Sequence, residues 1–516
     1  MQPIRLIKGF LTVGIWTLAS RLLGFARDMM IASYLGAGPV AEAFLIAFSL
    51  PNMFRRFFAE GAFNMAFVPM FSKKLEGGED AAGFARQAMS GLASVLIVLT
   101  LVAQLAMPWL VLAMASGFAA DERFALATGY GRIAFPYILF ISLAALLSGV
   151  LNASGRFAAA AAAPVLLNVV FVTAMIAADT AGWPIGDALA WAVPIAGVAQ
   201  LVLVWVAARR AGFTLLPGRP TLSPEMRRLA RIAAPAMLAG GVVQVNLLVG
   251  RQVASHFEGA IAWLNYADRL YQLPLGVVGI AIGVVLLPDL SRKLRAGDEA
   301  GGRHSFSRAG EFALALTVPS AVALAAIALP ITSVLYQRGH FSADDSLATA
   351  WAVAIYGLGL PAFVLQKVLQ PLFFARENTR TPFYYALVAM LVNAGLAIGL
   401  APVLGYLSSA VATTLAGWAM VFQLWRGSRT MGEAAQFDSR FVTRLPRIVA
   451  AAAIMGAALW GAAWALEGAL QAPGLRYLAL AGLIGLGIVA YFGAGALIGA
   501  FRLADFRSAL KRAPRG

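Results

Sequence analysis

The sequence predicts an all-α protein that crosses a membrane many times. Hydrophobic residues make up 60% of the 516 residues and charged residues only 12%, a balance unlike that of soluble proteins. Apolar runs of about 20 residues recur between short polar breaks, which suits helices that span a hydrocarbon core of about 30 Å. Alternating segments of about ten residues, which are typical of membrane β-barrels, do not recur along the chain.

We predict 14 transmembrane helices, one for each apolar run. They are expected at residues 10–34, 39–72, 87–115, 124–152, 157–178, 186–208, 232–255, 260–291, 309–335, 346–375, 381–401, 406–425, 448–466 and 475–500. The first run lacks a small-residue cleavage site, so we interpret it as a retained helix and not as a signal peptide.

The distribution of basic residues predicts the orientation of the chain. With the N-terminus placed in the cytoplasm, 29 of the 40 Lys and Arg residues fall in cytoplasmic segments and only Arg123, Arg338 and Arg476 fall outside. This bias places both termini inside and supports an even number of helices. It also accounts for the net charge of +16 without nucleic acid, because basic loops at this face contact anionic lipid headgroups.

Several chemistries are not expected. The chain has no cysteine, which excludes disulfides and thiolate catalysis, and its three histidines show no metal-ligand spacing. No nucleophile, histidine and acid pattern occurs, and the glycines are too dispersed for a phosphate loop. Nothing in these patterns indicates an enzyme, and we expect no metal and no cofactor. The energy source, a coupling cation or the membrane potential, stays open.

An internal repeat predicts two lobes. Residues 41–75 match residues 260–294 without gaps at a spacing of 219, and a second match at a spacing of 225 pairs Asn168 with Asn393. Six helices per repeat preserve orientation, so the lobes would be related by a pseudo-twofold axis along the membrane normal. Such bundles bind substrate between their lobes and alternate access by rocking. The first lobe is predicted at 1–215, the second at 216–430, and two additional helices with a cytoplasmic tail at 431–516.

Charged and polar side chains interrupt the first two predicted helices. These residues are Arg21, Arg27, Asp28, Asn52, Arg55, Arg56 and Glu60. A charge inside a membrane costs about 2.5 to 3.5 kcal/mol on insertion scales, so such residues usually face a cavity or a partner. We predict an anion-binding cavity. The alternative is that the arginines lie at helix ends and extend their heads to the lipid phosphates.

Helical spacing predicts how some of these side chains lie. Arg21 and Asp28 are seven residues apart and project from the same face, whereas Arg27 points elsewhere. Gly24 between them permits another helix to pack closely. In the second predicted helix, Arg56 and Glu60 are four residues apart and are expected to pair.

The second lobe carries its own charges. Arg251 lies in the seventh predicted helix, with no role assigned, and Asp268 and Arg269 lie in the eighth. Arg269 is opposite Leu50 in the repeat, and this asymmetry suits one asymmetric substrate. Arginines form forked hydrogen bonds to phosphate, so convergent guanidinium groups would match a pyrophosphate. A local structural pair is the alternative for Asp268 and Arg269.

Two acidic residues in an outer loop are interpreted as helix caps. Asp344 and Asp345 precede the tenth predicted helix, where carboxylates stabilise the first turn, so we favour capping over metal binding. The segments LNASGRF at 151–157 and RENTRTP at 376–382 are predicted to form cytoplasmic turns.

Four motifs resemble one known family. They are SRLLGFARD at 20–28, LPNMFRRFFAEGAFNMAFVPMFS at 50–72, FPYILFISLAALLSGVLNASGRF at 135–157 and YADRLYQLPLGVVGIAIGVVLLPDLS at 266–291. The chain is similar to the MurJ (MviN) lipid II flippases of the MOP exporter superfamily, from the first helix through the twelfth. The resemblance implies 14 helices in a bacterial inner membrane. It also implies movement of undecaprenyl-pyrophosphate-linked disaccharide pentapeptide from the cytoplasmic to the periplasmic leaflet.

The resemblance also implies roles for particular residues. The family's cavity arginines correspond to Arg21, Arg27, Arg55 and Arg269, and its acidic positions to Asp28, Glu42 and Glu60. Relatives commonly have Asp at the position of Glu42. Helices 13 and 14 would form a groove for the prenyl tail. No cation site is placed, although Asn378 and Asn393 are the polar groups considered. The expected partners are lipid II, membrane lipids and cell-wall synthesis proteins, and a monomer is expected.

Other functions remain as alternatives. A multidrug exporter would carry mainly acidic cavity groups and usually 12 helices, and a polysaccharide-lipid exporter is a further relative of the same superfamily. A membrane enzyme acting on prenyl phosphates would need a carboxylate cluster that binds a divalent metal. A non-transporting scaffold for cell-wall enzymes is the third alternative.

Overall fold

The computed structural model describes residues 3–58 and 62–500, and every regular element in these ranges is a helix. Ten helical stretches there are long and apolar enough to cross a membrane. The all-α membrane fold that the sequence predicts is thereby confirmed. The count of 14 spans stays a prediction, because helices that carry candidate charges, such as α1 (Pro3–Leu35) and α2 (Pro39–Phe58), are not among the ten.

The helices form two compact units. Unit 1 comprises Met1–Ala262 with Arg338–Phe341, and unit 2 comprises Trp263–Gln337 with Ser342–Gly516. Helix α9 (Pro224–Ala254) belongs to unit 1, where it packs against α2, α3 and α4. The sequence repeat groups this helix with the second lobe, so the boundary of the repeat and the boundary of the contacts differ. The predicted lobe limits remain a prediction.

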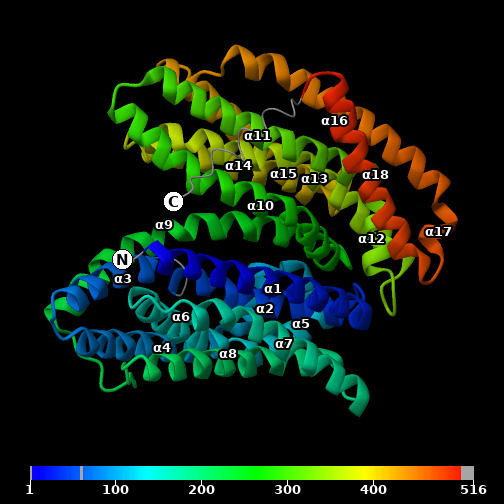
Figure 1. Ribbon diagram of the computed structural model, residues 1–516. Coiled ribbons are helices and arrows are strands. Elements are labelled where there is room, and N and C mark those ends of the chain that lie inside the picture. Colours follow the sequence, from blue (N-terminus) through cyan, green and yellow to red (C-terminus); the bar gives the residue numbers. More distant parts are fainter. Residues whose placement is uncertain (1–2, 59–61, 501–516) are drawn as a thin grey trace. The chain divides into compact units, whose positions relative to one another are not determined.

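Unit 1 is a bundle of antiparallel helices (Figure 1). After α1 and α2 come α3 (Ala62–Glu76), α4 (Ala81–Met114), η1 (Ser116–Ala120), α5 (Glu122–Ala134), α6 (Tyr137–Ala153), α7 (Ala158–Ala181), α8 (Ile185–Arg210) and α9. Helix α7 packs against α1 and α8, and α2 packs against α5. Phenylalanines fill the contacts, as where Phe171 on α7 meets Phe44 and Phe48 on α2.

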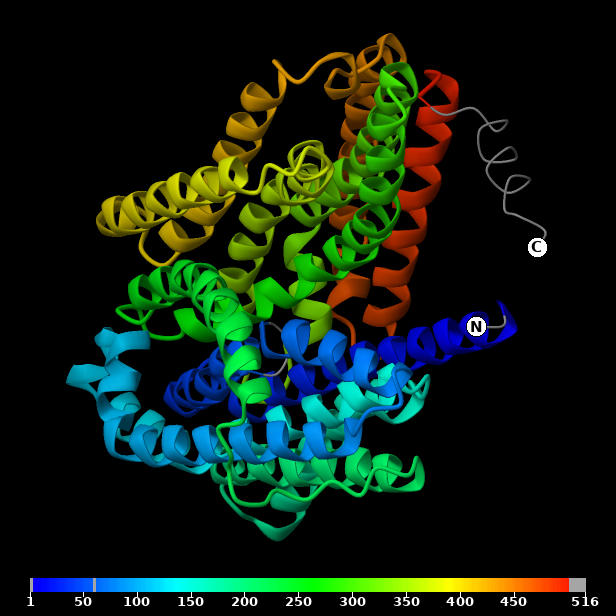
Figure 2. The same ribbon diagram turned by 90° about the vertical axis from the view of Figure 1, so that its left-hand side faces the viewer.

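The boundary between the units falls in the first turn of α10, so most of this helix belongs to unit 2. Its elements are α10 (Ala260–Arg295), α11 (Glu299–Ala326), α12 (Ala328–Tyr336), α13 (Ala343–Phe374), α14 (Arg380–Leu404), α15 (Leu407–Ser428), η2 (Glu433–Ala435), α16 (Ser439–Ala465), α17 (Glu467–Gln471) and α18 (Leu475–Leu497). Helix α13 packs against α11 and α15. Helix α16 runs beside α11 and beside α18, as both views show (Figures 1 and 2).

Several predicted helices begin or break elsewhere than predicted, and the one predicted at 309–335 is divided into α11 and α12. The helix predicted at 124–152 is divided into α5 and α6 at Pro136, which has no N–H to donate. The helices predicted at 309–335 and 448–466 begin earlier, at Glu299 and Ser439. Asp298 and Asp438 cap these two starts through their side chains. Apolar periodicity missed the added turns because they are polar and lie outside the predicted hydrocarbon core.

The predicted capping of α13 is confirmed. The hydroxyl of Ser342 accepts the backbone N–H of Asp345 at 3.1 Å, and the Asp345 carboxylate accepts the backbone N–H of Ser342 at 2.9 Å. The two predicted turns are confirmed as well. Gly155 has φ of 73° in the first turn and Glu377 has φ of 58° in the second.

Candidate functional site

Arg27 lies at the centre of a buried polar network in unit 1. Its side chain donates from Nε and Nη2 to Oδ1 of Asp28, at 3.0 and 2.7 Å, and from Nη1 to Oδ1 of Asn168 at 3.0 Å. The guanidinium also lies 5.4 Å from the ring centroid of Phe171. Only 7% of Arg27 and 5% of Asp28 is exposed. A buried charge of this kind needs a close counter-charge, and Asp28 supplies it.

Close packing of α1 on α7 places Asn168 within reach of Arg27. The Asn168 amide donates from Nδ2 to the backbone carbonyls of Ser20 at 2.9 Å and Pro164 at 3.3 Å. A Cβ placed on Gly24 would lie 3.5 Å from that amide nitrogen. Gly24 therefore faces α7, as the sequence predicted, and Asn168 joins the two helices while it orients Arg27.

Arg27 lies toward the face of Ser20, as predicted, because it reaches Asn168 of α7, whose amide also binds the Ser20 carbonyl. Its bond to Asp28 was not predicted. Neighbouring residues point about 100° apart on a helix, yet the long Arg27 side chain turns back and its guanidinium reaches the Asp28 carboxylate. Burial favours this contact, since both side chains are almost fully removed from the surface. Arg21, which shares the face of Asp28 on α1, is exposed within unit 1.

Glu42 forms a second buried network in unit 1. It has no exposed surface, and its Oε2 accepts a hydrogen bond from Nη1 of Arg123 at 2.8 Å. Its Oε1 accepts the backbone N–H of Ile261 at 2.9 Å. Ile261 lies in the first turn of α10, where the free N–H groups favour a negative charge. Glu42 thus links α2, α5 and the beginning of α10.

Arg123 is a member of this network that the sequence analysis did not single out. It donates to Asp121 from Nη2 at 2.6 Å, and its guanidinium lies 4.4 Å from the ring centroid of Phe118. The hydrogen bond from Arg123 holds the pKa of the Asp121 carboxyl below its ordinary value of 3.8, against the opposing effect of burial. The sequence did contain an indication of its importance, because Arg123 is one of only three basic residues in the predicted outer segments.

The remaining candidates of α2 lie near its C-terminal end. The Asn52 side chain donates to the Phe48 carbonyl at 2.8 Å, one turn earlier in the same helix. Arg55 is half-buried and Arg56 exposed, and both stand in the last turn, where the helix dipole favours positive charge. Glu60 lies outside the described residues, and so does its predicted pair with Arg56.

In unit 2, Asp268 and Arg269 occupy a half-buried stretch of α10. Asp268 accepts hydrogen bonds from the Gln272 amide and from the Tyr271 hydroxyl. The Tyr271 ring packs on Tyr356 of α13, with 5.1 Å between the centroids. Asp268 is therefore held by its own helix while the aromatic rings join α10 to α13.

The structure divides the candidate arginines between the units. Arg21, Arg27 and Arg55 belong to unit 1, and Arg269 belongs to unit 2. Arg27 is brought to Asp28 and Asn168, whereas convergence of the four guanidinium groups stays a prediction. Within the described residues, no group of three or more His, Asp or Glu side chains is arranged to hold a metal.

The groups considered for a cation site have different surroundings. Asn378 lies in the turn before α14, where its side chain accepts the Thr381 N–H at 3.1 Å and donates to the Thr381 hydroxyl at 2.9 Å. Asn393 is buried in the middle of α14. Asn378 therefore stabilises the turn, and the position of a cation site stays open.

Comparison with known proteins identifies the family. A family model described as lipid II flippase MurJ matches residues 31–471. The chain belongs to the MurJ lipid II flippase family. A probable lipid II flippase MurJ of Rhizobium meliloti is 45% identical over 522 residues, covering 98% of this chain and 96% of the relative. A probable MurJ of Vibrio cholerae is 34% identical, covering 98% of each chain.

Solved structures agree with the MurJ fold. A lipid II flippase MurJ in an inward closed conformation has a TM-score of 0.78 at 24% identity, covering 94% of this chain and 98% of the other. An inward-facing multidrug transporter of the MATE family, in the MOP superfamily, has a TM-score of 0.66 at 13% identity. It covers 80% of this chain and 95% of the other. At these identities the likeness concerns the fold alone.

Proposed function

We propose that this protein is a lipid II flippase. It moves undecaprenyl-pyrophosphate-linked disaccharide pentapeptide from the cytoplasmic to the periplasmic leaflet of a bacterial inner membrane by alternating access. The observation that carries the proposal is the match to the MurJ family over residues 31–471. Relatives named as lipid II flippases match over nearly the whole chain and support it.

The arginines are proposed to bind the pyrophosphate of the substrate. A guanidinium group is always protonated and donates two parallel hydrogen bonds to a phosphate, which suits this polyanion. Arg21 is exposed in unit 1, and Arg55 and Arg269 are partly exposed in their own units. Arg27 differs because Asp28 and Asn168 already hold it. In this proposal the pyrophosphate replaces Asp28 as a partner of Arg27 during transport.

Transport of lipid II by the purified protein tests the proposal. The full chain is reconstituted into vesicles with fluorescent lipid II in one leaflet, and the headgroup that reaches the other leaflet is measured with a membrane-impermeant reagent. We expect faster movement of lipid II than in protein-free vesicles and no faster movement of a labelled phosphatidylcholine. Equal rates with and without protein would contradict the proposal, and equal acceleration of both lipids would indicate an unselective scramblase. In cells, depletion should make lipid II accumulate in the inner leaflet.

The proposed orientation places both termini in the cytoplasm. Because the chain has no cysteine, single introduced cysteines are unique reporters. A cysteine at Gln436 should react only after the membrane is permeabilised from outside, and one at Ser116 should react with an impermeant thiol reagent in intact spheroplasts. The reverse pattern would invert the topology.

The energy source and the oligomeric state are part of the same proposal. A monomer is expected to act without a cofactor, driven by a coupling cation or by the membrane potential. Imposing a sodium gradient and a potassium diffusion potential separately on the vesicles distinguishes the two sources. Light scattering of the purified protein determines the oligomeric state. Co-purification with cell-wall synthesis enzymes tests the expected partners.

A further inference from the structure

Two prolines in unit 1 leave two backbone carbonyls without their usual donors. In an α-helix each carbonyl accepts the N–H of the residue four positions later. Pro108 in α4 stands four residues after Gln104, and Pro136, where α5 passes into α6, stands four residues after Arg132. Since proline has no N–H, the carbonyls of Gln104 and Arg132 lose these bonds.

The side chains of the same two residues bind these carbonyls. The Gln104 amide donates from Nε2 to the Arg132 carbonyl at 2.8 Å, and Arg132 donates from Nε to the Gln104 carbonyl at 3.3 Å. This reciprocal pair joins α4 to α5 and explains why two polar residues stand within apolar spans. It uses only one donor from each residue, so it does not explain why Arg132 is charged.

The positive charge of Arg132 has no counter-charge in the part of the chain that the structure describes. Among those residues, the bond from Nε is the one polar contact of this side chain, and no carboxylate pairs with it. The residue is exposed on the surface of unit 1. A guanidinium is always protonated, and a charge inside a membrane costs about 2.5 to 3.5 kcal/mol on insertion scales. A ligand with a negative charge would remove this cost.

Arg132 points away from the interior of unit 1. Arg123 stands nine residues earlier in α5, so on an ideal helix the two side chains leave from opposite sides. Arg123 faces α2, where it binds Glu42. Glu42 also accepts the N–H of Ile261, just before the chain enters unit 2, so the chain leaves unit 1 on the side of Arg123. Arg132 therefore lies on the outer side of the bundle, where membrane helices contact lipid.

The depth of Arg132 lets its guanidinium reach the lipid phosphates. Trp109 of α4 is 69% exposed, and tryptophans at such positions are enriched at the level of the headgroups. Gln104, which holds Arg132, lies five residues further in, about 8 Å along the helix axis. Helical side chains lean toward the N-terminus of their helix, and α5 runs inward from Glu122, so Arg132 leans back toward the level of Trp109. In the proposed orientation this is the outer leaflet.

Open space and an apolar surface border Arg132. A Cβ built on Gly129, one turn nearer to the outer end on the exposed side of α5, would meet no atom within 4 Å. Leu101 and Leu105 of α4 lie within about 100° of Gln104 on an ideal helix, and they are 61% and 78% exposed. The guanidinium thus has room for a headgroup on one side and an apolar surface for acyl chains on the other.

We propose that the surface between α4 and α5 at Arg132 binds the phosphate of a glycerophospholipid from the outer leaflet. The two Nη groups of Arg132 donate a forked pair of hydrogen bonds to the phosphate. Gly129 leaves room for the glycerol, and the acyl chains run inward along Leu101 and Leu105. An uncharged lipid leaves the guanidinium unpaired, and a free phosphate ion does not use the leucines. This lipid is not the transported substrate, so the site does not depend on the proposed function.

Lipid retention by the full chain tests the site. The protein is purified in detergent, titrated with phosphatidylglycerol or with a diacylglycerol of the same acyl chains, and analysed by native mass spectrometry. We expect the wild type to retain phosphatidylglycerol in preference to diacylglycerol. Arg132→Gln should bind phosphatidylglycerol about fivefold more weakly, because one basic side chain near a membrane surface contributes about that factor. Arg132→Lys keeps the charge and should retain most of the binding.

A second variant blocks the site and leaves the charge in place. Gly129→Leu fills the open space without a clash and should lower phosphatidylglycerol binding even if Arg132→Gln fails to fold. Its matched control is Gly91→Leu, which also enters open space on α4, and the charge control is Arg219→Gln in the exposed linker. Both controls should bind as the wild type does.

Three results would overturn the proposal. The first is an equal effect of the site variants and their controls on phosphatidylglycerol binding. The second is displacement of the lipid by inorganic phosphate. The third is a wild-type oligomer that dissociates in Arg132→Gln, because a carboxylate of a second copy would then be the partner of the arginine.

Discussion

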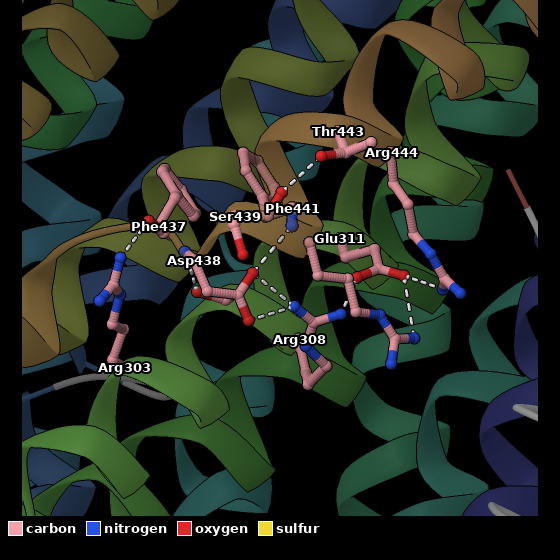
Figure 3. Close-up of polar contacts among 11 residues, drawn as sticks. Arg303, Arg308, Glu311, Phe437, Asp438, Ser439, Phe441, Thr443 and Arg444 are labelled. Carbon is pink, nitrogen blue, oxygen red and sulfur yellow. Dashed lines mark hydrogen bonds and ion pairs between the residues drawn. The ribbon is translucent and has the colours of Figure 1, made fainter.

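The Arg27 network of unit 1 and the α16 arginine cluster of unit 2 differ in how deeply their charges are buried. In the α16 arginine cluster, Arg308 pairs with Asp438 and Glu311, and Glu311 also pairs with Arg440 and Arg444 (Figure 3). Arg27 is buried and has one carboxylate, Asp28, with the neutral amide of Asn168 completing its hydrogen bonds. In the cluster, 41% of the Arg440 side chain is exposed. Inside the membrane an unmatched charge costs several kcal/mol, whereas water and lipid phosphates solvate it at the interface. The more deeply a charge is buried, the more it depends on a counter-charge within the protein.

The Glu42 network in unit 1 fits the same rule. Arg123 has two carboxylate partners, Glu42 and Asp121, so here the negative charge is in excess. The excess lies at Asp121, whose side chain is 40% exposed, and not at Glu42, whose side chain is fully buried. The positive charge of Arg123 thus balances the buried Glu42, and the excess negative charge lies at the exposed Asp121.

Removing Arg27 should have the largest effect. Arg27→Ala should abolish lipid II transport in the reconstituted assay while the protein still inserts into the membrane. The variant also removes a close counter-charge from the buried Asp28, which should lower stability by at most about 3 to 5 kcal/mol. Arg27→Lys should not restore transport, because an ammonium group cannot donate a fork to Asp28 and reach Asn168 as well. The control is Arg292→Ala, which changes an exposed arginine near the end of α10 and should transport lipid II as the wild type does. Transport at the wild-type rate by Arg27→Ala would remove Arg27 from the mechanism.

Breaking the Glu42 network should chiefly lower stability. Glu42→Ala leaves the Arg123 guanidinium buried beside an empty position and the Ile261 N–H without its acceptor, so we expect a loss of about 3 to 5 kcal/mol. Denaturation by SDS, followed by tryptophan fluorescence, measures it. Glu79→Ala removes an exposed carboxylate of unit 1 and serves as the control, with little expected change. In a Glu42→Ala/Arg123→Met variant most of the loss should be recovered. No recovery would show that the unpaired charge was not the cause.

Removing one carboxylate of the α16 arginine cluster should cost less. Asp438→Ala removes the helix cap and one partner of Arg308, and we expect a loss of about 1 to 2 kcal/mol. Arg308 keeps Glu311, and 24% of the Asp438 side chain is exposed, so water can replace part of the lost interaction. The same SDS titration measures the loss, with the exposed Asp344→Ala as the comparison. A cost equal to that of Glu42→Ala would contradict the dependence on depth.

The smallest expected effect is on pH dependence. Burial opposes ionisation of Asp438, but the Phe441 N–H and Arg308 outweigh it and hold the pKa of this carboxyl below its ordinary value of 3.8. The stability that this depressed pKa contributes is therefore complete above pH 3.8 and is lost as the pH falls through the value in the folded protein. The stability difference between wild type and Asp438→Asn should be constant from pH 7 to pH 5 and should shrink below pH 3.8. A difference that grows on acidification would be inconsistent with this sign.

Local features of the chain were predictable because they depend on near neighbours. The cap of Ser342 and Asp345 spans three residues, and Gly24 shows its role through its missing side chain. The starts of α11 and α16 were missed because their first turns are polar and an apolar pattern cannot register them. The bond between Arg27 and Asp28 was missed because ideal helix directions ignore how far a long side chain bends.

By itself, the sequence determined the class of the protein and its family, since these follow from composition, motifs and hydrophobic length. Only the tertiary structure decided how those charges are paired. Asn168 lies 141 residues from Arg27, Arg123 lies 81 from Glu42, and Arg444 lies 133 from Glu311. Partners so distant meet through the packing of particular helices, and helical periodicity carries no information about which helix becomes the neighbour.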